Sequence, residues 1–138
     1  MAFHKILALF GHAETDVKLV QRACELASEQ KASLRFLHIN ESDAGAVGLY
    51  GRVTYDHRYS REEIQELIQP YNTDGVPIEV EVVATDDLIE TIRESCTGTD
   101  LLIIGHEHQN LMTRWLTDSI DERIINSVPC DVLVVHST

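Results

Sequence analysis

The sequence predicts a single α/β domain built on a parallel sheet, with helices on both faces. Two observations indicate this fold class. Short apolar or alternating segments typical of strands recur along the chain. Segments with the apolar spacing of amphipathic helices lie between them. The length of 138 residues is close to the commonest domain size, so we expect one domain over residues 1–138.

The first part of the chain predicts two strands separated by a helix. Residues 6–10 form an apolar run that suits a strand buried on both faces. From residue 15, apolar side chains at helical spacing, with Val17 among them, predict a helix over about 15–30. Residues 34–39 are expected to form the second strand. Residues 40–59 have no stable period and are predicted to be a long loop.

A capping box marks the start of the next helix. Ser60 is followed three residues later by Glu63, the pair that reciprocally satisfies free backbone N–H groups. Ile64, Leu67 and Ile68 are expected to face the core from this helix. Pro70 should end or kink it, because proline has no N–H group to donate.

The second half repeats the alternation of strands and helices. Apolar residues alternate with glutamates over 78–82, which predicts a half-exposed strand at a sheet edge. Asp87 is expected to cap the following helix. Residues 101–104 and 132–135 are apolar runs and predict the last two strands. Residues 119–122 resemble a capping box, which would begin a helix between these last two strands.

Charge excludes several classes of partner. The chain has 23 acidic and 11 basic residues, a net charge of −12. A surface of this sign repels nucleic acid and anionic lipid, so neither is an expected partner. No apolar run approaches the ~20 residues that span a bilayer, and no export signal is visible. These features predict a cytoplasmic protein.

The cysteines predict neither a disulfide framework nor a zinc site. Cys24, Cys96 and Cys130 are odd in number and far apart in the sequence, and they lie among apolar neighbours. We therefore expect three reduced thiols.

Several segments resemble the universal stress protein family. Its opening strand, the end of its second strand and its carboxyl-terminal signature are all similar to parts of this chain. The matching segments are 5–10, 37–39, 100–105, 119–125 and 128–135. The resemblance covers nearly the whole chain except the segment 40–59. It implies the strand order 3-2-1-4-5 and a small-molecule site where strands 1 and 4 meet.

The nucleotide motif of that family is altered. ATP-binding members carry Gly-x2-Gly-x9-Gly-Ser/Thr after strand 4, and here Gly105 and Ser119 keep the first and last positions. His108 and Asp118 replace the two other glycines, and Gly11 stands where those members have an acidic residue. A side chain crowds the phosphate, and a carboxylate at a helix N-terminus repels it. The segment 105–109 also resembles the A-type branch, which lacks the motif, and we expect no ATP binding of the usual kind and no cofactor.

Histidines are expected to gather at the carboxyl ends of neighbouring strands. They are His12, His38, His106 and His108. Clustered imidazoles could bind zinc, with His12, His106 and His108 as candidates, or could act as a pH sensor. The interpretation that we favour is that they fill a pocket without a nucleotide, and we expect no metal.

The last strand is a candidate for self-association. In the implied order it lies at an edge, and apolar edges invite pairing. The resemblance implies a homodimer in which Val132, Leu133, Val134 and Val135 of two copies meet. No acid, base and nucleophile are grouped in the sequence, so no enzyme activity is expected. The predicted function is that of a non-catalytic, dimeric stress-response protein. The alternatives are a nucleotide (ATP or AMP) binder with an altered phosphate loop, and a metal- or pH-responsive binder.

Overall fold

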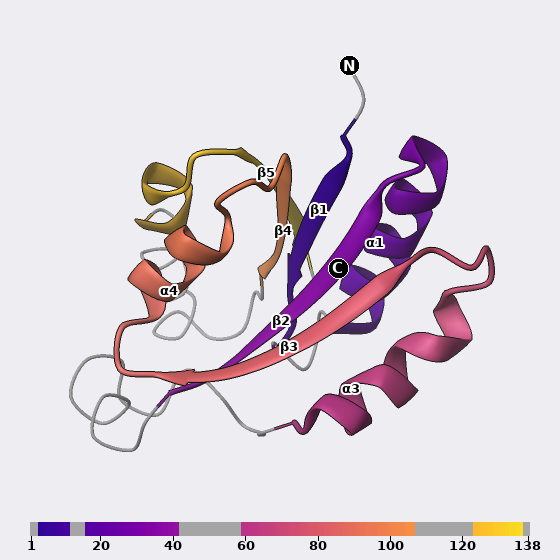
Figure 1. The fold of residues 1–138 in the computed structure, drawn as a ribbon, viewed down its shortest axis with the longest axis horizontal. Helices are drawn as coiled ribbons and strands as arrows, with labels where there is room; N and C mark the ends of the chain where they lie inside the picture. The colour runs from indigo at the N-terminus through magenta and orange to yellow at the C-terminus, as the bar shows by residue number, and fades with distance from the viewer. Residues whose placement is uncertain (1–2, 12–15, 42–58, 107–122, 137–138) are drawn as a thin grey trace.

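The computed structural model describes residues 3–11, 16–41, 59–106 and 123–136, and Figure 1 shows their fold. The elements follow the predicted alternation of strands and helices. In chain order they are β1 (Lys5–Leu9), α1 (Asp16–Gln30), β2 (Ser33–Glu41), α3 (Arg61–Ile68), the short 3-10 helix η1 (Gln69–Tyr71), β3 (Ile78–Thr85), α4 (Leu88–Ser95), β4 (Leu101–His106) and β5 (Asp131–His136). Residues 123–127 are also helical.

The strands form one parallel sheet in the order β3-β2-β1-β4-β5. This confirms the fold class and the strand order that the family resemblance implied. β3 lies at an edge, as its alternation of apolar and acidic residues predicted. β1 is central although it comes first in the chain, and it pairs with β2 on one side and β4 on the other.

Helices cover both faces of the sheet. α1 and α3 lie on one face, while α4 and the helix 123–127 lie on the other (Figure 1). Side chains alternate between the faces along each strand. In β1, Ile6 and Ala8 pack under α1 and α3, whereas Leu7 and Leu9 pack under α4. Each face therefore has its own apolar core.

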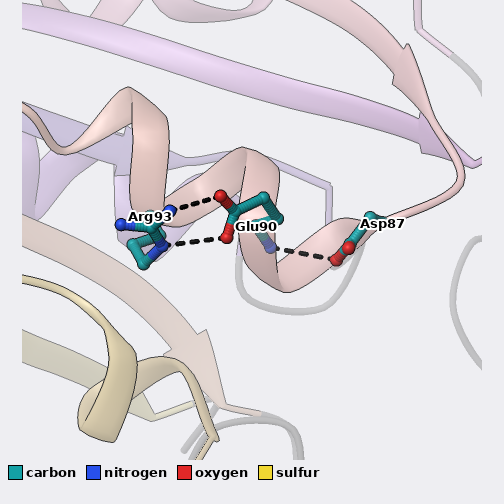
Figure 2. Close-up of polar contacts among 3 residues, drawn as sticks. All are labelled: Asp87, Glu90 and Arg93. Carbon is teal, nitrogen blue, oxygen red and sulfur yellow. Dashed lines mark hydrogen bonds and ion pairs between the residues drawn. The ribbon is translucent and has the colours of Figure 1, made fainter.

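The caps of two helices are those that the sequence predicted. Ser60 Oγ accepts a hydrogen bond from the Glu63 N–H at 3.1 Å, and Glu63 Oε1 accepts one from the Ser60 N–H at 2.9 Å. This capping box opens α3. In α4, Asp87 Oδ1 accepts from the Glu90 N–H at 3.1 Å (Figure 2). Arg93, one turn further on, holds the Glu90 carboxylate through Nε at 2.9 Å and through a second contact by Nη2.

The Asp100 carboxylate joins β4 to the neighbouring strand β1 at their amino ends. Asp100 Oδ2 accepts hydrogen bonds from the His4 N–H at 2.8 Å and the Lys5 N–H at 2.9 Å. These two bonds favour the charged form and hold the pKa of Asp100 below its ordinary value. The Asp100 N–H donates in turn to the Lys5 carbonyl at 2.9 Å. The start of β4 is thereby fixed against the start of β1.

Two side chains that were predicted to face the core are exposed instead. Val17 is 52% exposed on α1, and Leu67 is 46% exposed on α3. The buried stripe of α1 is centred on residues such as Leu19 and Ala23, and Val17 lies at its margin. Only Ile64 and Ile68 are buried on α3. Periodicity gave the correct helices, but the stripes that they bury are narrower than the apolar pattern.

Candidate functional site

The strand order reverses between β1 and β4, where open α/β sheets bind ligands at the carboxyl ends of the strands. Ala8 of β1 lies opposite Ile103 of β4. On its other side β1 pairs with β2, with Leu9 opposite Leu37. The residues that follow Leu9 therefore reach the carboxyl edge of the sheet between β2 and β4.

A buried carboxylate lies at the end of β1. Gly11 has a φ angle of 147°, a backbone conformation that residues other than glycine rarely adopt. Its N–H donates to Asp16 Oδ1 at 3.0 Å, and Asp16 is only 6% exposed. An acidic group thus reaches this edge from the first residue of α1. A role for Asp16 in this site was not predicted from the sequence, because no local pattern links its side chain to the Gly11 N–H.

His38 uses both of its ring nitrogens within the fold. It is fully buried in β2, and its Nδ1 lies 2.9 Å from the Phe10 carbonyl oxygen. That oxygen can only accept, so Nδ1 carries a hydrogen and donates it. Nε2 accepts from the Tyr59 N–H at 3.3 Å. The hydrogen bonds therefore select the neutral Nδ1–H tautomer, in which no lone pair points to a metal.

Aromatic rings surround this histidine. Phe10 and Tyr59 pack edge to face with centroids 5.1 Å apart, and His38 and Tyr59 do so at 5.4 Å. Burial raises the pKa of the Tyr59 hydroxyl, and the negative charges of Asp16 and Glu63 raise it further. The same charges make the electrostatic potential at this cluster negative.

The structure places some of the other predicted site residues. Gly105 is buried in β4 opposite Val135, and the backbone of His106 ends the same strand opposite His136. The remaining candidates lie outside the described residues: His12, His108, Asp118 and Ser119. In the part of the chain that is described, no group of three or more His, Cys, Asp or Glu side chains could hold a metal ion. The predicted gathering of four histidines stays a prediction.

The edge strand β5 presents the residues predicted to associate. It pairs with β4, with Leu102 opposite Val132 and Ile104 opposite Val134. Val135 is 7% exposed, whereas the three residues before it are half-buried. At the end of β5 the Lys18 ammonium group donates to the His136 carbonyl at 3.1 Å.

All three cysteines are free thiols. Cys96 and Cys130 interact with each other although they are distant in the sequence. Burial raises the pKa of Cys24 to about 11. Burial, reinforced by the neighbouring Cys130, raises the pKa of Cys96 to about 12. Cys130 is half-buried, and burial raises its pKa as well. High pKa values keep these thiols protonated and poorly nucleophilic near neutral pH.

Comparison with known proteins identifies the family. The sequence model of the universal stress protein family matches residues 2–136. The chain belongs to the universal stress protein family. A relative from Staphylococcus haemolyticus that is named as a universal stress protein is 26% identical over 142 residues, which cover 96% of this chain and 83% of the relative.

Solved universal stress proteins share the fold. One in complex with cAMP has a TM-score of 0.70 and 18% identity, with 100% of both chains covered. One from Archaeoglobus fulgidus in complex with dAMP has a TM-score of 0.65 and 12% identity, with 98% of this chain and 99% of the other covered. Identities this low show the common fold alone. Within the described segments, no helix combines the length and apolar character needed to cross a membrane.

Proposed function

We propose that this universal stress protein is a cytoplasmic, non-catalytic homodimer that does not bind ATP in the way of the family's nucleotide-binding members. The observation that carries the proposal is the buried Asp16 carboxylate at the carboxyl end of β1. A nucleotide at the strand 1/strand 4 junction would lie against this group.

Charge and hydrogen bonding both oppose a triphosphate there. The Gly11 N–H, a donor that a phosphate oxygen could use, already donates to Asp16 at 3.0 Å. A carboxylate with little exposure is weakly screened, so its repulsion of a polyphosphate is stronger than it would be in water. The sequence adds His108 and Asp118 at positions where ATP-binding members have glycine.

A nucleotide-binding function is the second candidate, and the solved complexes favour it. Proteins with this fold are known with cAMP and with dAMP, each of which carries a single phosphate. A carboxylate such as Asp16 can accept hydrogen bonds from a ribose hydroxyl or a base amino group. In this alternative, the site would select nucleotides with fewer negative charges than ATP.

Calorimetric titration separates the two candidates. We expect no saturable heat when ATP, AMP or cAMP is added to the wild type. The triple variant Asp16→Asn, His108→Gly, Asp118→Gly removes the buried charge, restores the bare backbone of the motif and should bind ATP. Adding Gly105→Arg to that variant should abolish the gain. A micromolar isotherm for ATP with the wild type would contradict the proposal, and binding of AMP or cAMP alone would favour the second candidate.

The homodimer is proposed to form through β5. Val132, Leu133 and Val134 of this edge strand are only half-buried within one chain, and pairing with a second copy would cover them. Val134→Lys places like charges at the two-fold contact. Sedimentation equilibrium should give twice the chain mass for the wild type and the single mass for the variant. The matched control is Glu79→Lys on the opposite edge strand β3, which should remain dimeric. A wild type of single mass would overturn this part of the proposal.

A further inference from the structure

A cavity of about 260 Å³ lies between α1 and α3, on the face of the sheet away from α4. Its described walls come from the end of β1, the first turns of α1, and the segment from Tyr59 through η1. Among the residues that the structure describes, none from β4 lines it. The cavity therefore lies beside the strand 1/strand 4 junction and shares Asp16 with it, and a ligand there would go beyond the proposed function.

The two aliphatic side chains that departed from the sequence prediction both line this cavity. Val17 is 52% exposed and Leu67 is 46% exposed, and they approach it from α1 and α3 respectively. Leaving this much apolar surface in water is unfavourable, whereas a ligand in the cavity would cover it. Their place in the wall indicates that the ligand has an apolar part.

Aromatic rings form another part of the wall. Phe10, Tyr59 and Tyr71 line the cavity, and the edge-to-face contact between Phe10 and Tyr59 fixes the orientation of two of them. The faces of aromatic rings attract cations through their quadrupole. Rings held by mutual packing lose little entropy on binding.

The charges of the wall also favour a cation. Asp16 and Glu66 are its acidic members, and no Lys or Arg side chain belongs to the wall as far as the described residues define it. Asp16 is 6% exposed, so its charge acts through a medium of low dielectric constant. The raised pKa of Tyr59, caused mainly by burial and then by Asp16 and Glu63, agrees with a negative potential here.

We propose that this cavity binds a small organic cation that carries a quaternary ammonium group. The methyl groups of such a cation would contact Val17 and Leu67, its charge would lie against the rings, and Glu66 would balance that charge at the rim. A primary ammonium group has a larger hydration cost, which the aromatic and aliphatic surface that forms most of the wall does not offset. The volume limits the ligand to about the size of choline or slightly larger.

Choline and its neutral isostere 3,3-dimethyl-1-butanol form a matched pair of probes, because they differ in replacing the quaternary nitrogen by carbon. Titration of the full chain, followed by 1H–15N NMR, should show saturable shifts of the Tyr59 and Tyr71 amides with choline, at a dissociation constant of about 1 mM or lower. The isostere should bind about tenfold more weakly. Ethanolamine, with a primary ammonium group, should also be weaker than choline.

Variants locate the site. Tyr71→Leu keeps an apolar side chain but removes a ring face, and it should weaken choline binding by about tenfold. Glu66→Gln removes a negative charge from an exposed position and should also weaken choline binding. Glu62→Gln on the same helix lies outside the cavity wall and is the matched control. Thermal unfolding should show that the three variants remain folded. Equal affinity for choline and its isostere, an equal effect of Glu62→Gln, or no saturable shift would overturn the proposal.

Discussion

The two faces of the sheet differ in the kind of side chain that they bury. The face under α1 and α3 contains Phe10 and Phe36, with Tyr59 and Tyr71 packed against them. The face under α4 is aliphatic, apart from thiols, over the residues that the structure describes. The aromatic face also holds His38 and the cavity between α1 and α3. We infer that specific polar and ring contacts organise the first face, whereas simple apolar packing organises the second.

Truncation of a central side chain on each face gives the largest expected difference. Phe36 and Leu102 are both fully buried. Phe36→Ala should cost about 4 kcal/mol of unfolding free energy and Leu102→Ala about 3 kcal/mol, because the aromatic ring leaves the larger cavity. Urea unfolding measures both values. An equal or larger loss for Leu102→Ala would show that the ring contributes no more stability to its face than a leucine does to the other.

His38 should show how far polar contacts organise the aromatic face. His38→Leu keeps apolar volume but leaves the Phe10 carbonyl and the Tyr59 N–H without the ring. The expected cost is about 2 kcal/mol. Ile39→Val, on the next residue and the opposite face, should cost about 1 kcal/mol and is the control. A His38→Leu variant as stable as the wild type would mean that these hydrogen bonds contribute no net stability.

Each face buries a thiol whose ionisation should couple folding to alkaline pH. The ordinary thiol pKa of 9.0 is raised to about 11 for Cys24, on the buried side of α1, and to about 12 for Cys96 at the end of α4. Above pH 9.0 the unfolded chain loses these protons while the folded chain keeps them, so stability falls as the pH rises towards the folded values. The slope is at most about 1.4 kcal/mol per pH unit for each thiol.

Urea unfolding of Cys24→Ala and Cys96→Ala, compared with the wild type across this pH range, tests the coupling. Each variant should lose stability less steeply than the wild type. The flattening for Cys96→Ala should extend to the higher pH, because its folded pKa is the higher of the two. Parallel curves for all three proteins would show that neither thiol has a raised pKa.

The helix caps should give the smallest effects, and they separate stability from ligand binding. Ser60→Ala removes the cap of α3, and Asp87→Ala removes that of α4. Each should cost about 1 kcal/mol of unfolding free energy. Only Ser60→Ala should also weaken choline binding, because α3 forms a wall of the cavity. Equal effects of the two variants on choline binding would argue against placing the ligand on the aromatic face.

Local features of this fold could be predicted from the sequence. The caps at Ser60 and Asp87 depend on residues three apart, so their spacing is visible in the chain. The break at Pro70 follows from the chemistry of proline, since α3 ends at Ile68 and continues only as η1. The order of the strands required the family resemblance, because hydrophobic periodicity does not specify which strands are neighbours.

Features that depend on tertiary contacts could not be predicted in this way. Asp16 reaches back to Gly11 only because α1 begins where it does, and nothing in the local pattern distinguishes this contact from a helix cap. Val17 fits the apolar period of α1 but lies at the margin of its buried stripe, where tertiary packing and not the period decides its exposure. Cys96 and Cys130 become neighbours through the pairing of β4 with β5, which no spacing rule for cysteines detects.

The central place of β1 has a consequence for biosynthesis. The ribosome makes this strand first, yet one of its sides stays unpaired until Leu101 to Ile103 have been synthesised. The hydrogen bond from the Lys5 N–H to Asp100 spans 95 positions, and loop closure over such a distance is entropically costly and slow. The nascent chain therefore carries an apolar strand with one open side until β4 has been synthesised. This interval is when the polypeptide is most exposed to aggregation and most in need of a chaperone.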